Sequence, residues 1–87
     1  MRNTSDVINL NLVAAERAAL MAAGILGLRT ANTTAAAQFL GVAPGTMRNW
    51  RAAGEGPAYE NVGRTGFYVR YSIPHLVAFK RKLEPAG

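Results

Sequence analysis

The chain has 87 residues, no cysteine, and ten Lys and Arg against five Asp and Glu, which gives a net charge of +5. This length predicts one small domain, and the missing cysteines exclude a disulfide framework and a thiolate metal site. Residues 42–87 hold seven Lys and Arg against three Glu, a net of +4, whereas residues 1–41 carry a net of only +1. A small domain with this much positive charge favours a polyanionic partner, and the second half of the chain is expected to meet it.

The N-terminal part is expected to contain one alanine-rich helix over residues 11–27, with Asn9 or Asn11 as its cap. Only Glu16 and Arg17 are charged within it. A membrane span needs roughly 20 consecutive apolar residues, so this interrupted segment predicts a soluble helix and no contact with a membrane. Such a helix is expected to pack on the rest of the domain or on another copy of the chain.

Two short helices are expected next, after a linker over residues 28–34. The first ends with AAAQFL, residues 35–40, and takes Thr33 or Thr34 as its cap. The second covers residues 44–53, with a proline in its first turn. Two helices joined by a Gly-containing turn of about three residues form a helix-turn-helix.

The second of these helices is the candidate reader of DNA bases. Met47 and Trp50 are three residues apart, share one face and are expected to pack in the core. The outward positions are then Pro44, Gly45, Arg48, Asn49 and Ala52. Arg suits guanine O6 and N7, and Asn suits adenine N6 and N7. The alternative is a solvated face that contacts phosphates only.

Phosphate contacts are expected beside this face. Arg51 lies off its centre and is expected to contact a phosphate. Ala43 and Gly45 add almost no bulk at the helix start, so the free N–H groups there can approach a phosphate closely. The Thr46 hydroxyl can bind the same phosphate.

A β-hairpin is expected from strands 59–62 and 67–71 around a turn over residues 63–66. Arg64 at its tip is a candidate for insertion into a minor groove with help from Thr65, or else an exposed turn residue without a partner. Arg70 faces outward and either contacts a phosphate or pairs with Glu60 across the hairpin.

The last expected helix follows from SIPHLVAFKRKL, with Ser72 as its cap and Leu76, Phe79 and Leu83 as its apolar stripe. The run Lys80-Arg81-Lys82 is either a solvated helix end or a surface toward DNA or a neighbouring copy. The single histidine, His75, at the helix start suggests a structural role. The sequence lacks paired carboxylates, a His cluster and a Gly-Lys-Ser/Thr phosphate loop, so we expect no catalysis, metal or cofactor.

The expected fold is mainly α with a small β-hairpin, a winged helix-turn-helix over residues 31–87 with an extra N-terminal helix in residues 1–30. Residues 34–83 resemble the excisionase-like winged helix domains related to the MerR DNA-binding domain. The motifs that carry this resemblance are Ala35-Ala36, Leu40-Gly41-Val42, Thr46-Met47, Trp50, Gly56-Pro57 and Arg70-Tyr71. The sequence departs from the family pattern at residues 43–45, where a Ser and basic or polar residues are usual, and residues 1–30 match nothing in it.

The resemblance implies a non-catalytic, sequence-specific DNA-binding protein of a phage or other mobile element, acting in the bacterial cytoplasm. An excisionase binds tandem sites together with other copies of itself, bends the DNA and directs a site-specific integrase toward excision. The alternative is a small MerR-like transcription regulator that binds promoter DNA as a dimer. MerR-type regulators use a long C-terminal coiled coil, which this sequence lacks. A protein-interaction module is a third possibility, against which the +4 charge of the second half argues.

Overall fold

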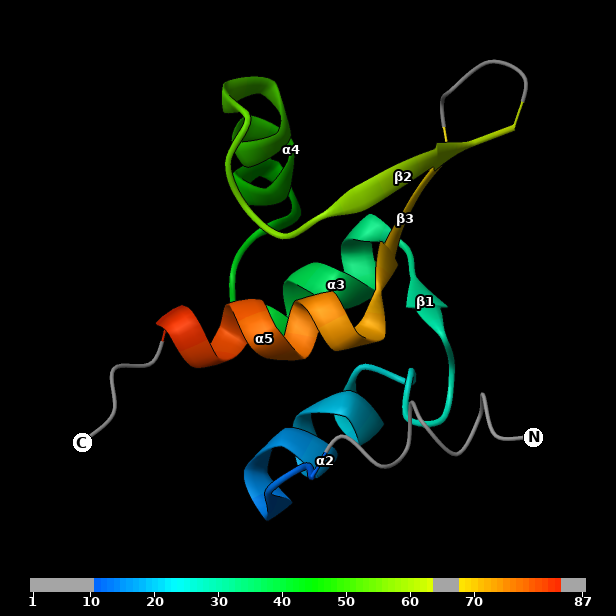
Figure 1. Ribbon diagram of the computed structural model, residues 1–87, viewed down its shortest axis with the longest axis vertical. Coiled ribbons are helices and arrows are strands. Elements are labelled where there is room, and N and C mark those ends of the chain that lie inside the picture. Colours follow the sequence, from blue (N-terminus) through cyan, green and yellow to red (C-terminus); the bar gives the residue numbers. More distant parts are fainter. Residues whose placement is uncertain (1–10, 64–67, 84–87) are drawn as a thin grey trace.

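Four helices and one three-stranded antiparallel sheet make up the described parts of the chain, residues 11–63 and 68–83 of a computed structural model (Figure 1). In chain order, the elements are α2 (Ala14–Ala22), β1 (Thr30–Ala31), α3 (Thr33–Leu40), α4 (Pro44–Ala53), β2 (Tyr59–Val62), β3 (Tyr68–Ser72) and α5 (Ile73–Leu83). The predicted combination of helices with a small hairpin is therefore present, with one strand more than we expected.

Local signals define the boundaries of α3 and α4. The side chain of Asn32 accepts a hydrogen bond from the N–H of Ala35 at 2.8 Å, so the cap of α3 is Asn32 and not Thr33 or Thr34. Gly41 ends α3 in the left-handed region, at φ 78°. Pro44 then opens α4, where its missing N–H costs no helical hydrogen bond, and the predicted range 44–53 is confirmed.

The sheet has the strand order β1-β3-β2, so the hairpin carries an additional short strand on its far side. Tyr59 lies opposite Tyr71 in the hairpin, and Thr30 lies opposite Ser72 in the β1–β3 pair. We expected a linker where β1 lies. A two-residue strand has no periodicity of its own, and only its pairing with β3 makes it a strand.

The first helix is shorter than the predicted range 11–27, because α2 ends at Ala22 and Gly24 follows with φ 75°. Its cap is also different: Val13 takes the cap position, and the carboxylate of Glu16 accepts a hydrogen bond from the Val13 N–H at 3.1 Å. The Glu16 side chain thus satisfies the backbone N–H of the cap residue itself, and the prediction of Asn9 or Asn11 as the cap is wrong.

One core joins all the helices to the sheet. Leu20 and Ile25 bring the N-terminal segment into it, Phe39 comes from α3, Tyr71 from β3 and Leu76 from α5, and each is at most 4% exposed. The N-terminal helix therefore packs on the rest of the chain. In Figure 1, α2 lies below α5, whereas α4 lies at the opposite end of the molecule.

Candidate nucleic-acid interface

Helix α4 has one buried face and one exposed face, as its sequence predicted. Met47 is fully buried, and Trp50 is partly buried with its ring edge-on to that of Phe79 at 5.3 Å between centroids. Arg48 and Asn49 are exposed. The two side chains with donors suited to base edges therefore lie on the side of α4 that the core leaves free.

The start of α4 carries little side-chain bulk. Ala43 caps it without a polar side chain, and Pro44, Gly45 and Thr46 form its first turn, all three half-buried. A Cβ atom added at Gly45 would meet nothing within 4 Å, so the space beside this backbone is open. Positive helix ends with little side-chain bulk favour anions such as phosphates.

Arg51 lies apart from this exposed face. One of its terminal nitrogens, Nη1, donates to the Tyr71 hydroxyl at 2.6 Å and to Thr33 Oγ1 at 3.3 Å. Its guanidinium also lies over the ring of Tyr59, 5.8 Å from the centroid. The side chain that we expected on a phosphate thus points toward the root of the hairpin and the start of α3.

Arg70 is half-buried and likewise has a partner within the protein. Its Nε and Nη2 atoms donate to Thr30 Oγ1 at 3.1 and 3.0 Å, which joins β3 to β1. Glu60 lies directly opposite Arg70 in the hairpin register, as the sequence suggested. The hydrogen bonds to Thr30 depend on the short strand that we had not predicted.

The hairpin extends away from the core at the same end of the molecule as α4 (Figure 1). Arg64 and Thr65, the residues predicted at its tip, lie outside the described residues. Next to them, Tyr68 is 68% exposed, and Tyr59 at the hairpin root is 39% exposed. The sequence analysis gave these tyrosines no role, although Tyr68 is two residues from Arg70 and strand alternation therefore places both on one face.

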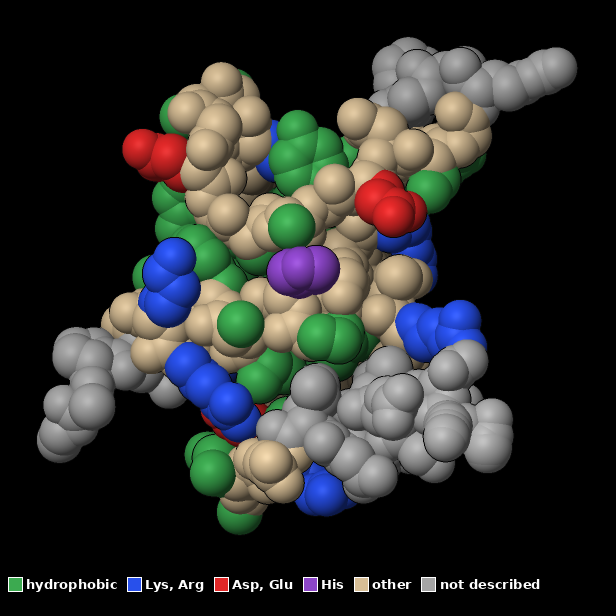
Figure 2. All heavy atoms as spheres, in the orientation of Figure 1, with side chains coloured by type: hydrophobic (Ala, Val, Ile, Leu, Met, Phe, Trp, Pro, Cys, Tyr) green, Lys and Arg blue, Asp and Glu red, His purple; other side chains and the backbone are tan. Residues whose placement is uncertain are grey.

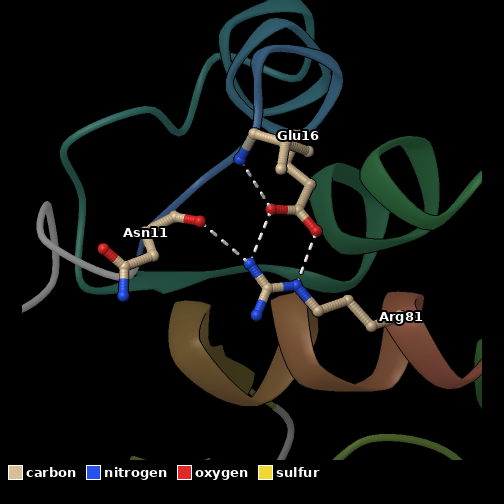
Figure 3. Close-up of polar contacts among 4 residues, drawn as sticks. Asn11, Glu16 and Arg81 are labelled. Carbon is tan, nitrogen blue, oxygen red and sulfur yellow. Dashed lines mark hydrogen bonds and ion pairs between the residues drawn. The ribbon is translucent and has the colours of Figure 1, made fainter.

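The basic run of α5 is divided among different contacts. Arg81 donates two hydrogen bonds to the carboxylate of Glu16, at 2.7 and 2.8 Å, and a third to the carbonyl of Asn11 at 3.3 Å (Figure 3). Lys80 lies over the ring of Phe39 and Lys82 over that of Phe79. The charge of Arg81 therefore joins α5 to α2 instead of facing a partner.

The ion pair also changes the acidity of Glu16. Its hydrogen bonds from Arg81 hold the pKa of the carboxyl below the usual value of 4.5, against the opposite effect of burial. Glu16 is 6% exposed, and its ion pair with Arg81 raises the free-energy cost of protonating the carboxylate. The pair joins α2 to α5, and it concerns the stability of the fold.

Positive charge does not gather in one field on the face shown in Figure 2. There, Lys and Arg side chains lie at separate places. This face therefore offers separate cations and no broad basic patch. Across residues 11–63 and 68–83, no group of three His, Cys, Asp or Glu side chains could hold a metal ion.

None of the helices in the described ranges combines the length and the apolar character that crossing a membrane requires. Comparisons with protein-family models, with curated proteins and with solved structures find no match to this chain.

Proposed function

We propose that this protein is a non-catalytic, sequence-specific binder of double-stranded DNA with a winged helix-turn-helix domain. The observation that carries the proposal is the division of α4, which buries Met47 and leaves Arg48 and Asn49 exposed beside a projecting hairpin. In this arrangement α3 and α4 are the helix-turn-helix and β2 with β3 is the wing. Helix α4 would enter the major groove, which is about 12 Å wide and admits an α-helix.

The other contacts follow from the same orientation. Gly45 and Thr46 at the open start of α4 would meet a phosphate with backbone N–H groups and a hydroxyl. Arg64, which the sequence predicts at the tip of the wing, would reach the adjacent minor groove. These contacts would place the protein on the duplex, while Arg48 and Asn49 would read the bases.

The finer proposal is that the protein acts as an excisionase of a phage or mobile element. It rests on the resemblance of residues 34–83 and on size. The longest dimension of the molecule is 35 Å, about one turn of B-DNA at roughly 34 Å, so a single copy covers little more than one turn. Several copies on tandem sites would bend the DNA and direct an integrase toward excision.

One observation favours the alternative, a regulator that binds promoter DNA as a dimer. Val13 and Met21, at the start and near the end of α2, are 56% and 60% exposed. Apolar side chains exposed to this extent are available to a second copy of the chain. Because α2 lies away from α4 in Figure 1, such a dimer would leave the proposed DNA surface free.

Footprinting on the DNA that flanks the gene of this protein, together with a circular-permutation gel for bending, tests the proposal. We expect protected tandem sites in head-to-tail order beside an integrase attachment site, and bent DNA. A single palindromic site over a promoter would support the regulator and contradict the excisionase. No protection of any duplex at low salt would contradict DNA binding itself.

Two arginine variants in the same experiment test whether the exposed face of α4 binds the DNA. Arg48→Met removes an exposed charge on α4, and Arg17→Met removes one on α2. Loss of a bidentate base contact costs about 1–3 kcal/mol, so the first variant should weaken protection roughly 5- to 150-fold. The second variant loses the same charge and should protect like the wild type. Equal effects of the two would assign the binding to charge alone.

A further inference from the structure

We propose that Arg51 is a positioning residue that fixes α4 against the hairpin, and that it is not one of the phosphate contacts. This inference rests on the proposed DNA binding, because the placement of α4 matters only if α4 and the wing meet the same duplex. It replaces the role that the sequence suggested for Arg51. It also gives Tyr71, which is buried, an indirect role in DNA binding.

The contacts of Arg51 reach three other elements. Its Nη1 atom donates to Tyr71 on β3 and to Thr33 at the first residue of α3, and its guanidinium covers the ring of Tyr59 on β2. Tyr59 and Tyr71 are register partners, with ring centroids 6.0 Å apart. One side chain of α4 is therefore joined to both strands of the hairpin and to the preceding helix.

Burial strengthens the link between Arg51 and Tyr71. Tyr71 is 1% exposed, so its hydroxyl lies inside the protein and needs a partner there. The 2.6 Å hydrogen bond from Arg51 supplies that partner, and a charged donor makes such a bond stronger than a neutral one. Without the guanidinium, the buried hydroxyl would lose the donor, and α4 would lose its polar link to the hairpin.

The chain itself links α4 to the hairpin through one short loop. Residues 54–58 connect α4 to β2, and Gly54 and Gly56 within them have positive φ values of 74° and 85°. A side-chain link beyond this loop would hold α4 and the wing at the spacing that two adjacent grooves require. Arg51 would thus act on DNA affinity through Tyr71, without touching the DNA.

Arg51→Met, Tyr71→Phe and the double variant test this role, with Arg17→Met as the control for charge. Each protein is titrated over a range of salt concentrations with a duplex that the wild type selects from a randomised library, and with an unselected duplex. A lost phosphate contact lowers the slope of log affinity against log salt by about 0.9. A positioning residue leaves this slope unchanged.

We expect Arg51→Met and Tyr71→Phe each to bind the selected duplex about tenfold more weakly, with wild-type slopes and little change on the unselected duplex. The double variant should be no weaker than about the worse single variant, because both changes remove the same link. A lower slope for Arg51→Met with normal binding by Tyr71→Phe would overturn the inference and restore the phosphate contact.

Hydrogen exchange without DNA separates this inference from the proposed function. We expect faster exchange of the β2 and β3 amides in Arg51→Met and Tyr71→Phe than in the wild type and in Arg17→Met. If the wild type bound no duplex, DNA binding would fail, yet the exchange result would still show whether Arg51 holds the hairpin. Wild-type exchange in both variants would overturn the positioning role whatever the DNA result.

Discussion

At the scale of single residues, charge is used in two different ways. Glu16 and Arg81 form a bidentate ion pair that stabilises the fold, whereas Arg48 is exposed and available to a partner. Sequence reasoning placed Arg48 on the outward face because Met47 and Trp50 define the opposite face of α4. It could not find the pair between Glu16 and Arg81, since these residues are 65 positions apart and only the packing of α2 on α5 brings them together.

The ion pair predicts a dependence of stability on pH. The pKa of Glu16 is lowered in the folded protein, so its contribution to stability is present above pH 4.5, its usual value, and is lost as the pH falls through the lowered folded value. We expect the free energy of unfolding to fall more steeply on acidification in the wild type than in Glu16→Gln. Urea denaturation at several pH values between about 6 and 3 measures this difference.

The two proteins should therefore become similar in stability at low pH, because protonated Glu16 and glutamine are both uncharged. A constant difference in the free energy of unfolding between pH 6 and pH 3, at the ends of this range, would show that Glu16 contributes no charge-dependent stability.

At the scale of the elements, the loop from α4 to β2 illustrates how backbone and side chain act together. A Cβ atom at Gly56 would lie 2.9 Å from the Cβ atom of Trp50, whereas one at Gly54 would meet nothing within 4 Å. Both glycines have positive φ values near 80°. The loop therefore passes closely over Trp50, and this passage holds the side of α4 opposite to its exposed face.

The two glycines form a matched pair for a stability measurement. An L-residue in the left-handed region costs roughly 1–2 kcal/mol, which is what we expect for Gly54→Ala. Gly56→Ala should cost about 1–3 kcal/mol more, because its methyl group collides with Trp50. Chemical denaturation of both variants gives the two values. Equal losses of stability would mean that a methyl group at position 56 does not collide with Trp50.

How much of the fold the sequence predicts also depends on the element. The bounds of α4 follow from Pro44 and Gly54, whose effects on the backbone are local. Strand β1 and the true length of α2 were missed, because β1 exists through its pairing with β3 and because a single glycine such as Gly24 can either end a helix or lie within one. Likewise, the sequence of α4 does not reveal the partner of Arg51, because the hydroxyl that accepts its hydrogen bond belongs to Tyr71 on the hairpin.

At the scale of the whole molecule, the proposed DNA surface and the N-terminal helix lie at opposite ends. Helix α4 and the hairpin project at one end in Figure 1, and α2 lies at the other, joined to the core through Leu20 and Ile25. The core between them consists mainly of α3, α5 and β3 side chains. DNA at one end and another protein or copy at the other could thus be bound at the same time.

The most direct measurement of the central claim is a titration of the ¹⁵N-labelled protein with a short selected duplex, followed by amide chemical shifts. We predict that the largest changes lie in residues 43–52 and in the hairpin, with little change in α2, because these segments occupy opposite ends of the molecule. Changes centred on α2 with α4 unaffected, or no changes at low salt, would contradict the account.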